Sequence, residues 1–299
     1  MSDYKKPGVY VEEIDAFPNS VVEVATAVPA FLGYTEMVSR GAQDVTGVPV
    51  RISSLPEFEQ IFGVGPDQRF GWNRDDAGRD GFAVQGQRFH LHASMRLFFQ
   101  NGGGVCWIVS LGGYDAQGYG AEDASDAIWQ ALAEEAEPTM YLMPDAVALS
   151  RADHRSICER MLAECSRLGD RMAILDVHDG RGPAQEGSAL AQHIDGAING
   201  PDGFRAMHFG DAPSFGAAYY PWLESTLHRS GLVDFRMLDM ASRTALAKAI
   251  NSELAPPEGS AMAKDIALLA DPALTPERSA GLHTELAATS FVYRDVMAG

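Results

Sequence analysis

Short apolar runs alternate with amphipathic helical patterns through the middle of the chain. Residues 27–35, 105–110 and 172–177 are rich in apolar and β-compatible side chains, which is typical of buried strands. In residues 154–168 the apolar positions recur at the spacing of an amphipathic helix. Strands separated by helices of this length predict an α/β fold, with a mostly parallel sheet flanked by helices.

The same patterns predict the remaining elements of this region. A short helix is expected between residues 53 and 63, where a serine cap and a proline precede acidic positions. Residues 64–87 are rich in Gly, Asp, Arg and Gln, and are expected to form a long loop that is mobile or contacts a partner. Further helices are expected over residues 88–101, 124–135 and 186–198, and further strands over residues 48–52, 139–143, 205–209 and 217–220.

The start of the chain has the pattern of an extended arm. Pro7, Gly8 and Pro18 surround a short apolar run over residues 9–11, which disfavours a helix. A β-capable segment without a partner of its own is suited to add a strand to the sheet of another molecule. Residues 1–20 are therefore predicted to be an extended N-terminal arm.

The pattern changes again after Trp222. Ala- and Leu-rich helical patterns follow, separated by prolines, over residues 241–254, 260–270 and 276–296. These patterns predict a helical C-terminal extension rather than further strand–helix units. The expected domains are an arm over residues 1–20, an α/β core over residues 21–224 and a helical extension over residues 225–299.

Composition narrows the class of function. The 299 residues are 46% hydrophobic, which suffices for a sizeable core. The 23 Lys and Arg against 41 Asp and Glu give a net charge of −18, which disfavours direct binding of nucleic acid. No apolar run approaches the length of a membrane span, and the three cysteines are too few for a disulfide framework. We therefore expect a globular protein with no direct contact to nucleic acid or membrane.

The strongest enzymatic signal is a set of acidic residues near the ends of predicted strands. Asp145, Asp176 and Asp179 lie where open α/β sheets bind ligands, and with His178 they could hold a divalent cation or exchange protons. Aspartates after strands also commonly cap or turn the chain, and no nucleophile or phosphate-binding motif accompanies them. The pattern favours a protein that is not an enzyme and has no cofactor or metal.

Six segments, taken in order, resemble the contractile tail sheath proteins of bacteriophages and of related extracellular injection systems. Together they cover roughly residues 4–224. The six segments are residues 7–13 (PGVYVEE), residues 52–58 (ISSLPEF) with residues 62–63 (FG) after them, residues 98–104 (FFQNGGG), residues 143–145 (MPD), residues 169–176 (GDRMAILD) and residues 218–222 (AYYPW).

The resemblance implies a structural subunit that assembles helically around an inner tube and contracts to drive that tube through a target envelope. It implies other sheath subunits, an inner tube protein, and baseplate and tail-terminator proteins as partners. Assembly is expected in the bacterial cytoplasm, within a phage tail or an injection particle. In this family, terminal arms add strands to sheets of neighbouring subunits. The residues expected to form that intersubunit contact here are Pro7, Gly8, Val9, Tyr10, Val11, Glu12 and Glu13.

Residues 225–299 depart from the family pattern. The usual continuation, a stretch similar to Arg-Gly-Val-Trp-Lys-Ala-Pro-Ala followed by a C-terminal domain with its own arm, has no counterpart there. This departure keeps two alternatives open: a tail terminator or adaptor, and a specialised sheath paralogue. A metal-dependent α/β enzyme that uses Asp145, Asp176 and His178 is the remaining, less favoured hypothesis.

Overall fold

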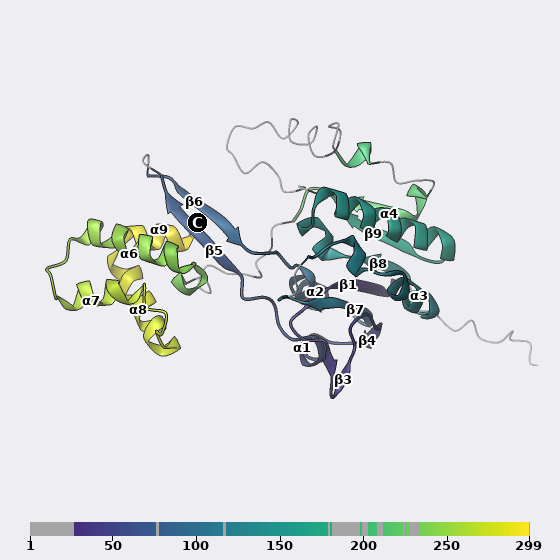
Figure 1. The fold of residues 1–299 in the computed structure, drawn as a ribbon, viewed down its shortest axis with the longest axis horizontal. Coiled ribbons are helices and arrows are strands. Elements are labelled where there is room, and N and C mark those ends of the chain that lie inside the picture. The colour runs from purple at the N-terminus through teal and green to yellow at the C-terminus, as the bar shows by residue number, and fades with distance from the viewer. Residues whose placement is uncertain are drawn as a thin grey trace, which may run out of the picture.

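The structure is a computed structural model with two visibly separate parts (Figure 1). A β-sheet covered by helices forms one part, and a bundle of C-terminal helices alongside a β-hairpin forms the other (Figure 1). The structure describes residues 27–75, 78–115, 118–178, 180, 198, 203–207, 212–223, 225, 227 and 234–298.

Six strands form the sheet of the core, and they confirm the predicted α/β class. Every neighbouring pair is parallel except the last, in which β4 runs antiparallel to β7. In spatial order the strands are β10 (Gly216–Tyr219), β9 (Met172–Asp176), β8 (Met140–Leu142), β1 (Pro29–Thr35), β7 (Cys106–Gly113) and β4 (Val50–Ile52).

Helices cover both faces of this sheet, because its central strands are apolar on both sides. Successive side chains of β1 point to opposite faces. Leu32 packs into one cluster and Phe31 into the other. The first cluster includes residues of α3 (Asp126–Glu134) and α4 (Arg151–Leu168). The second includes residues of α1 (Leu55–Phe62) and α2 (Leu91–Gln100).

A β-hairpin replaces the long loop that we expected over residues 64–87. Strands β5 (Arg69–Arg74) and β6 (Asp80–Gln85) pair antiparallel over their whole length. The expectation was wrong because Phe70 and Trp72 alternate with polar or small residues, and this period-two signal is weak beside the abundant Gly and Arg. Trp72 is buried by C-terminal helices, which are distant in sequence.

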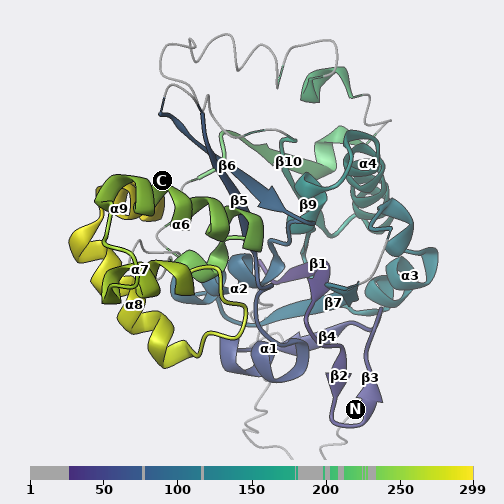
Figure 2. The same cartoon turned by 60° about the vertical axis from the view of Figure 1, so that its left-hand side comes forward.

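Four helices form the C-terminal bundle and pack around a separate hydrophobic cluster. The predicted pattern over residues 276–296 divides into two helices at Ser290, whose hydroxyl accepts from the amide of Tyr293. Figure 2 shows the bundle in front of the core, beside β5. The four helices are α6 (Met240–Leu254), α7 (Ala261–Leu268), α8 (Pro276–Thr289) and α9 (Phe291–Ala298).

Two further differences from the sequence prediction are local. The strand expected over residues 205–209 is wrong in its described part, where Phe204–Ala206 forms a 3₁₀ turn. A small hairpin of β2 (Ser39–Arg40) and β3 (Gln43–Asp44) was not predicted. The helix expected over residues 186–198 falls almost entirely outside the described residues. Among the described residues, the other 3₁₀ turns are Ala121–Asp123, Pro144–Ala148, Pro213–Phe215 and Phe235–Met237.

Candidate assembly surfaces

Asp145 is a structural carboxylate in this fold. Its side chain is buried between β1 and the start of α2, where Oδ2 accepts from the amide of Tyr34 at 2.7 Å. Oδ1 accepts from the amides of His90 and Leu91 and so caps the N-terminus of α2. Burial raises the pKa of Asp145 to about 6, although the three amides act in the opposite direction. Through these hydrogen bonds the carboxylate joins its own segment, which follows β8, to β1 and to the start of α2.

The histidines near the end of β9 also serve the fold. His154 Nε2 donates to the backbone carbonyl of Asp176 at 2.9 Å, and His178 Nε2 donates to the carbonyl of Leu149 at 3.1 Å. Among the described residues, no group of three acidic, histidine or cysteine side chains is placed to hold a metal ion. Asp179, the remaining member of the predicted set, lies outside the described residues.

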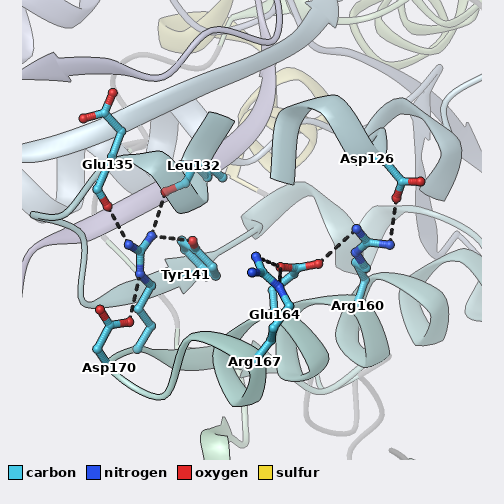
Figure 3. A network of polar contacts seen from close by, with 9 residues as sticks. Asp126, Leu132, Glu135, Tyr141, Arg160, Glu164, Arg167 and Asp170 are labelled. Atoms are coloured by element: carbon cyan, nitrogen blue, oxygen red, sulfur yellow. Dashed lines mark hydrogen bonds and ion pairs between the residues drawn. The ribbon is translucent and has the colours of Figure 1, made fainter. Parts of the chain in front are cut away.

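A buried arginine joins α3, β8 and the start of β9 (Figure 3). Arg171 donates to the carbonyl of Leu132 at 2.7 Å, to the carbonyl of Glu135 and to the hydroxyl of Tyr141 at 2.6 Å. The two carbonyls lie at the end of α3, where helical hydrogen bonds run out. A single side chain therefore satisfies a helix terminus and fixes it against the sheet.

An ion-pair chain continues this network along α4 (Figure 3). Glu164 accepts from Arg167 at 2.6 Å and from Arg160 at 3.0 Å, and Arg160 reaches Asp126 on α3 at 2.8 Å. Glu164 is buried while its partners are more exposed, so the chain connects the core to its surface. Sequence reasoning did not identify this network. The pairs within α4 are separated by three or four residues, a spacing common to many surface ion pairs, and the link from Arg160 to Asp126 forms only in the fold.

Strand β10 forms one edge of the core sheet. Within the described part of the chain it pairs with β9 alone. Tyr219 at its end is 61% exposed, and Leu223 shortly after it is 92% exposed. An unpaired strand edge next to exposed apolar side chains is a template for another chain. This edge is one candidate assembly surface.

Strand β4 ends the sheet on the other side, and a small polar cluster lies beside it. Arg51 binds Glu137 through two hydrogen bonds of 2.7 and 3.0 Å, and Trp107 Nε1 donates to the same carboxylate at 2.9 Å. Among the described residues, β4 pairs with β7 alone. Its outer backbone edge is the second candidate surface.

Strand β6 of the hairpin is the third open edge. Strand β5 is covered on its outer side, where the amide of Asp239 donates to the carbonyl of Phe70 and Ser242 bonds both backbone groups of Trp72. In the described ranges, residues 81–84 of β6 have no backbone partner outside the hairpin. Phe82 on this strand is 40% exposed.

Three other sequence expectations concern the N-terminal arm, the cysteines and membrane-spanning helices. The predicted intersubunit arm, residues Pro7 to Glu13, lies outside the described residues. All three cysteines are buried and free. No helix in the described ranges is both long enough and apolar enough to cross a membrane.

Comparison with known proteins finds likenesses among solved structures. No protein-family model matches the chain, and no curated protein matches it. The chain is similar to a chain of the anti-feeding prophage helical sheath in its contracted state, with 22% identity and a TM-score of 0.36 over 62% of this chain and 43% of that chain.

Two cryo-EM structures of the anti-feeding prophage baseplate contain further similar chains. In the contracted state the identity is 21% and the TM-score 0.44, over 76% of this chain and 50% of that one. In the six-fold symmetrised baseplate the identity is 22% and the TM-score 0.37, over 75% of this chain and 48% of that one. The chain thus spans half or less of the length of each of these three chains.

Proposed function

We propose that the chain is a structural subunit of a contractile injection particle, with sheath subunit as its specific role. The observation that carries the proposal is the resemblance of six segments, in order, to contractile sheath proteins. The described segments fall where the core elements join. Residues 98–104 connect α2 to β7, residues 143–145 follow β8, and residues 169–176 lead from α4 through β9.

Assembly is the activity that this architecture supports. Many copies joined by weak, repeated contacts can form two helical lattices, and contraction releases the free-energy difference between them. Such work needs open edges and a rigid core, and it needs no catalytic group. The open edges of β10, β4 and β6 supply possible contacts, while Asp145 and Arg171 hold the core together.

The N-terminal arm has a defined part in this proposal. Residues 7–13 of one copy add a strand to a sheet of a neighbouring copy, with backbone hydrogen bonds giving affinity. Residues 21–224 form the sheath core, and residues 225–299 form a helical extension in place of the usual sheath ending. The wider partners are the inner tube, the baseplate and the tail terminator.

Electron microscopy tests this proposal. The chain is co-expressed with the products of its neighbouring genes, and purified particles are imaged. Hollow tubes or rings that contain many copies of the chain are expected. A protein that stays monomeric in the presence of a tube protein and a baseplate would contradict the proposal.

A tail terminator or adaptor is the second candidate, and the departure of residues 225–299 from the sheath pattern favours it. The bundle packs against β5 and occupies the outer side of that strand. A terminator or adaptor forms a ring with few copies, whereas a sheath forms a sleeve with many. Copy number in the intact particle, measured by quantitative mass spectrometry against the tube protein, separates the two roles.

A further inference from the structure

A pocket of about 460 Å³ lies where the hairpin joins the core, beside α2. Phe70 and Val84 of the hairpin line it, together with Arg88 and His90, which precede α2, and Arg96 within α2. We call it the hairpin pocket. Its volume falls within the range of roughly 300–1,000 Å³ that is usual for ligand sites. It therefore has room for several side chains of a partner.

The hairpin pocket is positive although the chain carries a net charge of −18. No acidic residue is among its described lining residues. Most arginines of the described chain bind a carboxylate, as Arg74 binds Asp80 at 2.7 Å. Arg88 and Arg96 have no such pair in the described ranges. Two uncompensated guanidinium groups in one pocket favour an occupant that brings carboxylates.

The walls of the hairpin pocket are fixed by contacts already made. His92 Nε2 and Glu59 Oε1 are 3.0 Å apart, which joins α2 to α1. Gln68 donates to the carbonyl of Gln85 at 2.8 Å and closes the base of the hairpin. A preformed site binds a partner with less loss of conformational freedom than a site that must first be ordered.

Two carboxylates at the end of α3 carry the complementary charge. Glu134 is the last residue of α3 and Glu135 follows it, and no basic residue lies in the last turn of this helix. In the described ranges neither carboxylate has a hydrogen bond or an ion pair. Figure 3 shows the Glu135 carboxylate directed away from the arginine that holds its backbone carbonyl. The helix dipole disfavours negative charge at this end, so a positive partner would relieve an unfavourable arrangement.

The hairpin pocket and the end of α3 lie at opposite ends of the core sheet. Tyr34, near the carboxyl end of β1, is joined through Asp145 to the start of α2 and hence to the pocket. Beyond α3, the amide of Thr139 donates to the carbonyl of Val28, which precedes β1. The seven residues of β1 separate the two ends by roughly 20 Å, at about 3.3 Å per residue.

The end of α3 is fixed within the core and cannot turn back to the pocket of its own copy. Arg171 holds the carbonyls of Leu132 and Glu135. In Figures 1 and 2, α3 lies on the side of the core away from the hairpin. The two surfaces can therefore meet only between different molecules.

The charges favour a second copy of the chain as that other molecule. Among the described residues, Glu134 and Glu135 are the only adjacent carboxylates that both lack a partner. Arg88 and Arg96 are the two pocket arginines that lack one. Each copy thus presents two guanidinium groups on one surface and two carboxylates on the other.

We propose that the hairpin pocket of one copy receives the end of α3, with Glu134 and Glu135, of a second copy. This inference rests on the proposed assembly function and names a contact through which copies join. The two surfaces differ, so the contact is head-to-tail and every dimer keeps one free pocket and one free α3 end. Contacts of this kind close into rings or continue as open helical assemblies.

Charge reversal in the purified full-length chain tests the contact. Sedimentation velocity at low salt should show native oligomers that grow with protein concentration. Arg88→Glu with Arg96→Glu, and separately Glu134→Arg with Glu135→Arg, should each raise the apparent Kd of self-association at least about ten-fold, because like charges then face each other. Raising NaCl from about 0.05 to 0.5 M should also weaken native association, because salt screens exposed charges.

Mixing the two double variants gives the sharpest result. The acidic pocket of the first variant meets the basic α3 end of the second, and the basic pocket of the second meets the acidic α3 end of the first. An equimolar mixture should therefore regain most of the association that each variant lacks alone. Arg40→Glu and Glu122→Arg are the matched controls, since both residues are exposed and lie outside the pocket and α3.

Circular dichroism checks that each variant is folded. Arg88→Glu and Glu134→Arg alone, both at exposed positions, replace a double variant that does not fold. The proposal is overturned by a native chain that stays monomeric, by variants that associate like the native chain, or by folded variants whose mixture stays dissociated.

Assembly with the partner proteins separates this contact from the proposed function. Tubes formed equally well by the charge variants would remove the contact and leave the assembly function. Association restored in the mixture, with no particle formed in the presence of a tube protein and a baseplate, would remove the assembly function and leave the contact.

Discussion

In both the core and the C-terminal bundle an arginine side chain donates to the carbonyls at the C-terminus of a helix, but the two parts are stabilised by different contacts. In the core, Arg171 donates to the carbonyls that end α3, and in the bundle Arg243 donates to the carbonyls of Leu269 and Asp271 just beyond α7. The core is built on a six-stranded sheet. The bundle has no strand of its own among the described residues, and its described hydrogen bonds to the rest of the chain all reach β5.

This difference indicates how each part responds to damage. A change inside the core acts on a sheet with helices on both faces, so it should affect the whole core at once. A change at β5 should release the bundle and leave the core folded. Four substitutions test this contrast, and they are ordered by expected effect.

Arg171→Met is expected to have the largest effect. It leaves a buried carbonyl, a partly buried carbonyl and the Tyr141 hydroxyl without this donor, and should lower the free energy of unfolding of the core by about 3–5 kcal/mol. Urea unfolding followed by tryptophan fluorescence measures it. Arg155→Ala removes an exposed ion pair on α4 as the control, with an expected change of about 0.3–0.5 kcal/mol. Equal effects for both variants would contradict the role assigned to Arg171.

Trp72→Ala is expected to cost about 3 kcal/mol, because it empties a buried site between β5 and the bundle. The loss should be local. Hydrogen exchange should show faster exchange in α6 to α9 and unchanged exchange in β1 and β7. Asn73→Ala, at the next position of β5, where the side chain is exposed and points to the opposite face, serves as the control. Faster exchange throughout the core would show that the two parts do not respond separately.

Asp145→Asn is expected to cost about 2 kcal/mol at pH 4, because the side-chain NH2 group of Asn donates and cannot replace an oxygen that accepts from the backbone amides. The pH dependence has a defined sign. A pKa of about 6 in the folded state exceeds the ordinary value of 3.8 for Asp. The native state therefore binds more protons, and the stability contribution of Asp145 is present below about pH 4 and lost as the pH rises through 6.

Unfolding curves at several pH values check this sign. The difference in unfolding free energy between the native protein and the Asp145→Asn variant should shrink between pH 4 and pH 7. A difference that grows over this interval would mean that the hydrogen bonds outweigh burial at this carboxylate.

Glu253→Gln is expected to have the smallest effect, about 1 kcal/mol, confined to the bundle. The carboxylate accepts from the amide of Phe291 at 2.7 Å and from the amide of Val292 at 3.3 Å, so it caps the start of α9. Circular dichroism during thermal unfolding measures the loss. Glu285→Gln, on the exposed surface of α8, is the control. If the two variants unfold at the same temperature, the capping role assigned to Glu253 is contradicted.

The sequence predicted the elements whose signal is local. Strands β1, β7 and β9 are continuous apolar runs, and α4 has a clear helical period with Ser150 and Gly169 at its ends. The hairpin was missed because the burial of Trp72 depends on Ser242 and its neighbours, which are distant in sequence. Tertiary contacts of this kind have no local pattern.

The candidate assembly surfaces and the role of Asp145 could be predicted only in part, because they too depend on tertiary contacts. Asp145 was identified as a functional candidate from its place after β8, yet its role follows from the amides of Tyr34, His90 and Leu91. These groups come together only in the fold. The open edges of β10 and β6 likewise depend on strand order, which local patterns do not specify.

Hydrogen exchange of the assembled particle against the free chain tests the central claim most directly. If the chain works by assembly through open edges, amides of β10 and of β6 should become protected in the particle, while those of β1 and β7 remain unchanged. Particles in which neither edge gains protection, or a chain that forms no particle with its partners, would contradict the account.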